Sequence, residues 1–140
     1  ESNDHSGDYS YIAFYETPDS IENEWLYVRE VYNLTLNADL VTLSACQTGL
    51  GELRRGEGII GLTRAFTYAG AKSIVNTLWS VDDKRTMLLM TQFYRYLKAG
   101  QQKDAALGNA KRDFIHKDEL WAHPVFWAGF IGIGDMRAID

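Results

Sequence analysis

Two apolar runs on either side of one helix-like segment constrain the fold most strongly. The first, ADLVTLSAC, covers residues 38–46, and the second, AKSIVNTLW, covers residues 71–79. Neither run alternates strictly between apolar and polar residues, and each has the length of a strand. Strands covered on both faces have this composition, which is typical of parallel sheets. We therefore expect buried strands over residues 39–46 and 71–79.

The remaining segments alternate between strand-like and helix-like patterns. Glycines at positions 70 and 100 follow two of the periodic segments and are expected to end helices there. The order is β-α-β-α-β-α-α-β, which predicts an α/β fold of three layers: a mostly parallel sheet with helices on both faces. A chain of 140 residues is expected to form a single domain over 1–140. The expected strands are 9–15, 39–46, 71–79 and 123–135, and the expected helices are 24–34, 57–70, 80–100 and 101–117.

Composition excludes several classes of protein. The formal charge of −5 gives no support for nucleic-acid binding, which favours a basic surface. No apolar stretch reaches the roughly 18 residues that a membrane span needs. The single cysteine excludes an internal disulfide and suits a reducing compartment. These features predict a cytoplasmic protein with neither a nucleic-acid nor a membrane partner.

That cysteine, Cys46, ends the first apolar run and is followed by a glycine-rich loop, QTGLGELRRGEG. In parallel sheets, reacting groups lie just beyond the carboxyl ends of strands. A loop of small residues leaves room for a substrate, and its amides are able to surround an oxyanion. A free thiol is a weak nucleophile until a base or a positive field lowers its pKa. A buried, inert thiol is the competing interpretation, and the residues alone leave both open.

A nucleophilic cysteine needs a base, and the chain has three histidines. His5 lies in the polar start, and His116 lies at an expected helix end, where a solvated side chain is typical. His123 precedes the last expected strand, which places it at the opposite end from Cys46 if that strand is parallel. The residues therefore predict no Cys–His dyad within this chain.

Two carboxylates follow the second apolar run. Asp82 and Asp83 either cap the next helix and complement its dipole, or form an acidic pocket beside Cys46 that receives a basic side chain. Both interpretations hold at once if each residue takes one role. Arg54 and Arg55 on the glycine loop raise the local potential or are simply solvated. Three large aromatic residues near the ends of the expected strands are expected in the core: Trp79, Trp127 and Phe130.

Other site types find little support. A dinucleotide-binding G-x-G-x-x-G beginning at Gly49 fails at Arg54, where glycine is required. The sequence holds no phosphate-binding G-x-x-x-x-G-K-[ST], no H-E-x-x-H and no Cys/His cluster. Neither a metal nor an organic cofactor is therefore expected, although a nucleotide-binding α/β domain remains a third alternative.

The combination S-A-C-x-T-G, G-E-G, A-G-A and L-W-S-V-D-D, over residues 44–83, resembles the CHAT domain, a caspase-like domain found with tetratricopeptide repeats. The resemblance covers nearly the whole chain and is weakest at its start. It implies a caspase-like fold and a Cys–His dyad that cleaves peptide bonds, with Cys46 as the nucleophile. The related separases have an LWDVTD segment and prefer a basic residue before the cut. Asp83 matches its final aspartate, and Asp82 lies beside it.

One departure from the family is important. The catalytic histidine of the family ends a strand upstream of the segment matched here by YSYIAFY, and no such segment is present. His5 lies near that place but does not end a strand, so the role is not transferred to it. The expectation is therefore the nucleophile-bearing part of a cysteine endopeptidase, with a histidine outside the chain as its base and an oxyanion amide missing beside it.

The implied partners are a protein or peptide substrate and a tetratricopeptide-repeat region in a longer chain. The alternative is a catalytically inactive caspase-like module that binds other proteins. The missing strand would leave an unpaired hydrophobic sheet edge, so we also expect self-association of the isolated chain, which light scattering would detect.

Overall fold

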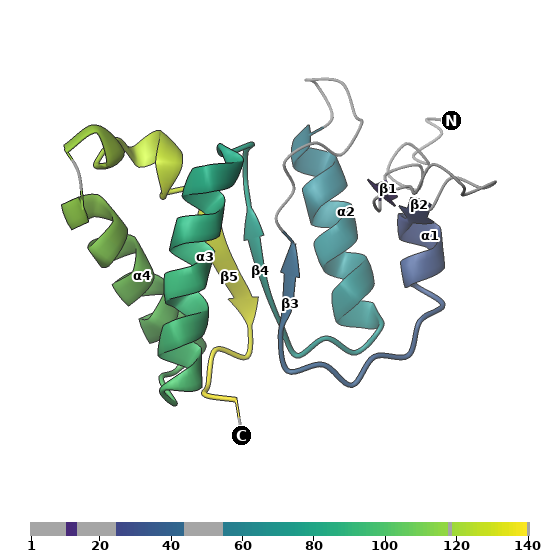
Figure 1. The fold of residues 1–140 in the computed structure, drawn as a ribbon. Coiled ribbons are helices and arrows are strands. Elements are labelled where there is room, and N and C mark those ends of the chain that lie inside the picture. Colours follow the sequence, from purple (N-terminus) through teal and green to yellow (C-terminus); the bar gives the residue numbers. More distant parts are fainter. Residues whose placement is uncertain (1–10, 14–24, 44–54, 118, 140) are drawn as a thin grey trace, which may run out of the picture. The chain divides into compact units, whose positions relative to one another are not determined.

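The computed structural model describes residues 11–13, 25–43, 55–117 and 119–139, and they divide between two compact units. The first unit contains the strands β1 (Tyr11–Ala13) and β2 (Trp25–Tyr27) and the helices α1 (Val28–Val31) and α2 (Arg55–Tyr68). The second contains the strands β3 (Val41–Leu43), β4 (Ser73–Thr77) and β5 (Phe130–Gly134) and the helices α3 (Asp83–Lys98) and α4 (Lys103–Lys117). Two single-turn 3-10 helices, η3 (Glu119–Trp121) and η4 (Pro124–Phe126), precede β5 (Figure 1).

In the first unit, β1 and β2 pair in an antiparallel two-stranded sheet. The aromatic rings of Tyr11 and Trp25 stack on this pair, with centroids 4.5 Å apart. The sequence predicted a helix over residues 24–34, but the structure begins this segment as a strand and gives only four residues to α1. The helical spacing of Val28 and Val31 is confirmed, since both are buried. The residues before them, Trp25–Tyr27, form β2 and pair with β1 instead, as suits their two aromatic side chains.

Both glycines that were predicted to end helices do so. Gly70 has a φ of 106° and Gly100 a φ of 81°, in the left-handed region that favours glycine. After α2, the amide of Ala71 donates to the carbonyl of Phe66 and the amide of Gly70 to that of Thr67. After α3, the amides of residues 101 and 100 donate to the carbonyls of residues 96 and 97 in the same way. These paired bonds form a Schellman motif at the end of each helix.

In the second unit, three strands form a sheet in the order β3-β4-β5. β3 and β4 are parallel, with Thr42 opposite Val75, whereas β5 is antiparallel to β4, with Phe130 opposite Thr77. The prediction of an α/β fold is confirmed to this extent: the chain combines helices with a sheet that is partly parallel. The final strand, predicted over residues 123–135, is shorter: residues 124–126 form η4, and β5 then runs antiparallel to β4.

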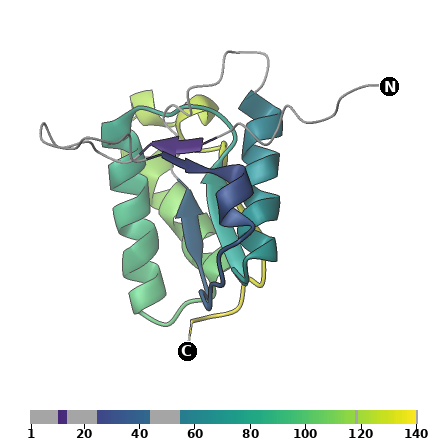
Figure 2. The same cartoon turned by 90° about the vertical axis from the view of Figure 1, so that its right-hand side faces the viewer.

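All five residues of β4 are buried, as predicted for this strand, although Ser73, Asn76 and Thr77 are polar. One face of the sheet packs against α3 and α4 (Figure 2). Leu89 and Phe93 from α3 and Ala110 and Phe114 from α4 are almost fully buried against strand residues of this unit. The strand side chains of this cluster are Val75 and Phe130.

Candidate functional site at the carboxyl ends of the strands

The sequence placed its candidate nucleophile, Cys46, at the end of the strand predicted over residues 39–46, which corresponds to β3. The described part of β3 ends at Leu43, and Cys46 lies outside the described residues, as do His5 and Arg54. Arg55 begins α2, and its side chain is also outside the description. The site is therefore built from what surrounds the carboxyl ends of β3 and β4.

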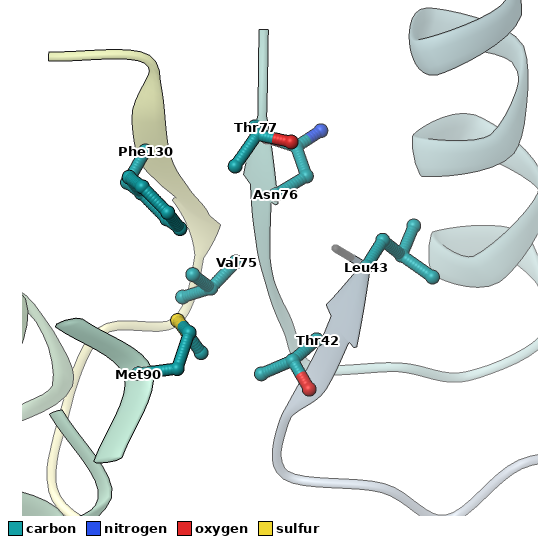
Figure 3. A pocket seen from close by; sticks show the side chains of 7 residues that line it. All are labelled: Thr42, Leu43, Val75, Asn76, Thr77, Met90 and Phe130. Atoms are coloured by element: carbon teal, nitrogen blue, oxygen red, sulfur yellow. The ribbon is translucent and has the colours of Figure 1, made fainter. Parts of the chain in front are cut away.

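A small pocket lies between the sheet and α3 at this place, with a volume of about 160 Å³ that includes its open mouth (Figure 3). Figure 3 shows Val75, Met90 and Phe130 on one side of the sheet, and Leu43 pointing to the other. The described residues that line this pocket carry no charge, so they do not form the acidic pocket that the sequence suggested. The lining consists of Thr42, Leu43, Val75, Asn76, Thr77, Met90 and Phe130.

The two carboxylates after β4 have different surroundings. Asp82 is the N-cap of α3, and its Oδ1 accepts a hydrogen bond from the backbone amide of Arg85 at 3.1 Å. The same oxygen lies 3.4 Å from Nη1 of Arg85. Asp82 therefore takes the capping role, which satisfies a free amide in the first turn.

Asp83 is the first residue of α3, and its side chain is exposed. Within the described part of the chain, its carboxylate has no hydrogen bond or ion pair. A carboxylate at this helix end is favoured by the dipole, and its oxygens remain open to an incoming cation. The structure thus gives the capping role to Asp82, and recognition of a basic side chain by Asp83 stays a prediction.

Carboxylates at the other end of the sheet are engaged. Asp39, just before β3, accepts a hydrogen bond from the Lys72 ammonium at 2.7 Å, which lowers the pKa of Asp39. Asp135, just after β5, accepts hydrogen bonds from the side chain and backbone of Arg137, which hold the pKa of Asp135 well below its usual range. Among these acids, Asp83 is the one whose oxygens are not engaged by another described residue.

The prediction that Trp79 lies in the core is wrong. The residue is 37% exposed and lies two residues beyond the end of β4. Its indole Nε1 donates to the carbonyl of Val125 in η4 at 2.7 Å, and its ring lies against Gly129. Phe130 is buried as predicted, and Trp127 is partly buried against the core. The side chain of Trp79 is therefore held in place at the surface.

His123 would lie at the opposite end of the sheet from Cys46 only if the last strand were parallel, and this condition is not met. Because β5 is antiparallel to β4, the segment before β5 returns to the carboxyl end of β4, and not to the opposite end of the sheet. His123 is the N-cap of η4, where its Nδ1 accepts a hydrogen bond from the amide of Val125 at 3.3 Å. The neutral ring then carries its proton on Nε2, which makes that nitrogen a donor. This tautomer does not suit a base that must take a proton from a thiol.

The other described histidine, His116, lies near the end of α4 with an exposed ring whose Nδ1 is 2.7 Å from the carbonyl of Arg112. This agrees with the solvated position predicted for it. No group of three or more His, Cys, Asp or Glu side chains is arranged to hold a metal among the residues that the structure covers. A membrane-spanning helix is likewise not found among them.

The sequence comparisons agree with the motifs around this site. Residues 3–135 match the family described as the CHAT domain. The chain is 34% identical over 109 residues to tetratricopeptide repeat protein 28 of Mus musculus, and 35% identical over the same length to the Homo sapiens protein of that name. These alignments cover 78% of this chain but only 4% of each relative. The chain therefore belongs to the CHAT domain family, a family of caspase-like fold.

Proposed function

We propose that this chain is the nucleophile-bearing part of a cysteine endopeptidase that cuts protein substrates after a basic residue. The observation that carries the proposal lies after β4, where Asp82 caps α3 and the exposed Asp83 carboxylate has no hydrogen bond or ion pair to any other residue that the structure describes. The family motif supports Cys46 as the nucleophile, three residues along the chain from the last residue of the neighbouring parallel strand β3. Parallel neighbours end at the same sheet edge, where substrates of such folds bind.

The proposed reaction follows from thiol chemistry. The Cys46 thiol gives its proton to a histidine outside this chain, and its sulfur attacks the scissile carbonyl carbon. The backbone amide of Cys46 donates to the oxyanion of the tetrahedral intermediate. The C–N bond then breaks, and the imidazolium protonates the departing amine. Water, activated by the same imidazole, hydrolyses the thioester and restores the thiol.

Substrate recognition in this proposal depends on Asp83. A carboxylate with both oxygens available accepts two parallel hydrogen bonds from an arginine guanidinium, or one ion pair from a lysine ammonium. The residues that line the pocket at the carboxyl ends of β3 and β4 are uncharged, so they do not provide an ion pair for a basic side chain. The matched relatives are tetratricopeptide-repeat proteins, and a repeat region that presents the substrate would fit this proposal.

Peptide cleavage by the longest natural form of the protein tests the proposal. A library of fluorogenic peptides that vary the residue before the cut should show cleavage after Arg and Lys. Cys46→Ala should lower kcat by about 10⁴-fold or more, because the covalent route is lost. Cleavage that survives Cys46→Ala, or no cleavage of any peptide by the unaltered protein, would favour the inactive binding module.

A further inference from the structure

Three contacts tie the segment that leads into α3 to the segment that leads into β5. The amide of Leu78 donates to the carbonyl of Gly129 at 2.9 Å, one residue beyond the last ladder pair. The indole of Trp79 donates to the carbonyl of Val125 at 2.7 Å. The guanidinium carbon of Arg85 lies 4.2 Å from the centroid of the Phe126 ring. These contacts join residues 78–85 to residues 125–129 at the start of α3.

The contact between Trp79 and Gly129 leaves no room for a side chain at position 129. A Cβ atom at position 129 would lie 2.8 Å from Cε2 of Trp79 and 3.0 Å from its Cδ2. Real Cβ atoms do not approach so closely, so any larger residue at 129 must displace the indole or the backbone. The glycine therefore lets the ring lie flat against the chain and keeps its N–H in line with Val125.

Burial alone does not explain why the side chain of Trp79 is held in one position. An indole that is 37% exposed gains only part of the free energy that a core tryptophan gains, yet its N–H is satisfied and its ring is fixed from one side. Arg85 extends the same arrangement, since it stacks on Phe126 and also reaches the capping carboxylate of Asp82. Side chains from both segments thus restrain the start of α3, where Asp83 lies.

We propose that Trp79, held by Gly129 and by η4, is a positioning residue that fixes the acidic start of α3 for recognition of a basic substrate residue; this inference rests on the proposed function. Trp79 does not need to touch the substrate in this role. It acts through the segment at residues 80–82, whose orientation sets where the Asp83 carboxylate points. Small displacements of a recognition group lower selectivity more than they lower chemistry at a separate nucleophile.

Two variants disturb this arrangement by different routes. Trp79→Phe keeps an aromatic ring but removes the N–H that bonds Val125. Gly129→Ala leaves every polar group in place and displaces the indole by overlap. Gly108→Ala is the matched control, because its Cβ would meet only the Arg112 side chain at ordinary contact distances of 3.8 and 4.0 Å.

The test uses the longest natural form of the protein and paired peptides that carry Arg or norleucine before the cut. Both variants should lower the ratio of kcat/KM for Arg over norleucine by roughly tenfold. The loss should fall mainly on KM for the Arg peptide, with the rate of Cys46 alkylation unchanged. Hydrogen exchange should quicken in residues 78–86 but not in α4, and Gly108→Ala should change none of these quantities.

A double-mutant cycle separates positioning from general destabilisation. If Gly129→Ala acts through the indole, it should cost little further selectivity once Trp79 is already alanine. An unchanged Arg preference in both single variants, while the unaltered protein cleaves after Arg, would overturn the positioning role and leave the proposed function standing. An unaltered protein without any Arg preference would overturn the recognition role of Asp83 and this inference together.

Discussion

At the scale of single residues, two adjacent carboxylates differ in what they already bind. Asp82 accepts from the amide and lies near the guanidinium of Arg85, whereas Asp83 has no such partner among the described residues. The sequence predicted that the pair would cap a helix or receive a cation, but not which residue does which. That assignment depends on the residue at which α3 begins, and helix boundaries are the least certain feature of a sequence prediction.

Neutralising each acid separately should give different results. Asp83→Asn should lower kcat/KM for peptides with Arg before the cut by about 10- to 100-fold, because the charge-assisted hydrogen bonds are lost. Asp82→Asn removes the neighbouring charge but keeps a good capping side chain, so its effect should stay within about threefold. Steady-state kinetics in the longest natural form measures both, and equal losses in the two variants would contradict the assignment.

At the scale of elements, the sequence predicted best where a long periodic segment has a clear end. α2, α3 and α4 lie within one or a few residues of the predicted spans, and Gly70 and Gly100 end two of them. β4 was recognised from a strand-length segment without strict alternation, and its residues are buried although Ser73, Asn76 and Thr77 are polar. The predictions failed where local pattern competes with pairing: residues 25–27 joined a hairpin, and residues 124–126 formed η4. Direction of pairing, as in β5, cannot be inferred from composition.

The role of Gly70 at the end of α2 is tested by substitution. Gly70→Ala should destabilise the protein by about 1–3 kcal/mol, because its φ is 106° and a Cβ atom there would overlap the carbonyl of Leu36. Gly61→Ala, within the same helix, has open space around its Cβ and should gain up to about 1 kcal/mol from helix propensity. Urea unfolding of both variants measures the difference, and equal stabilities would contradict it.

At the scale of the whole molecule, the family motifs identified more than the physical patterns did. The sequence motifs alone predict membership of the CHAT family, and the family match over residues 3–135 confirms it. The described residues add the exposed acid, the restraining contacts of Trp79 and the antiparallel return of β5. Cys46 lies outside the described residues, so its chemistry stays a prediction. Self-association of the isolated chain also stays a prediction; among the described strands, β3 pairs only with β4 and forms one edge of its sheet.

The most direct test of the central claim is the pH dependence of iodoacetamide alkylation at Cys46, in the longest natural form of the protein and in this chain alone. Cys46 is the only cysteine here, so the modified site in the chain is unambiguous. An activated nucleophile predicts a thiol pKa well below about 8.5 in the longer form and a higher one in the isolated chain, which lacks the upstream base. Slow alkylation with an ordinary or raised pKa in both forms would contradict the peptidase and identify a buried structural thiol.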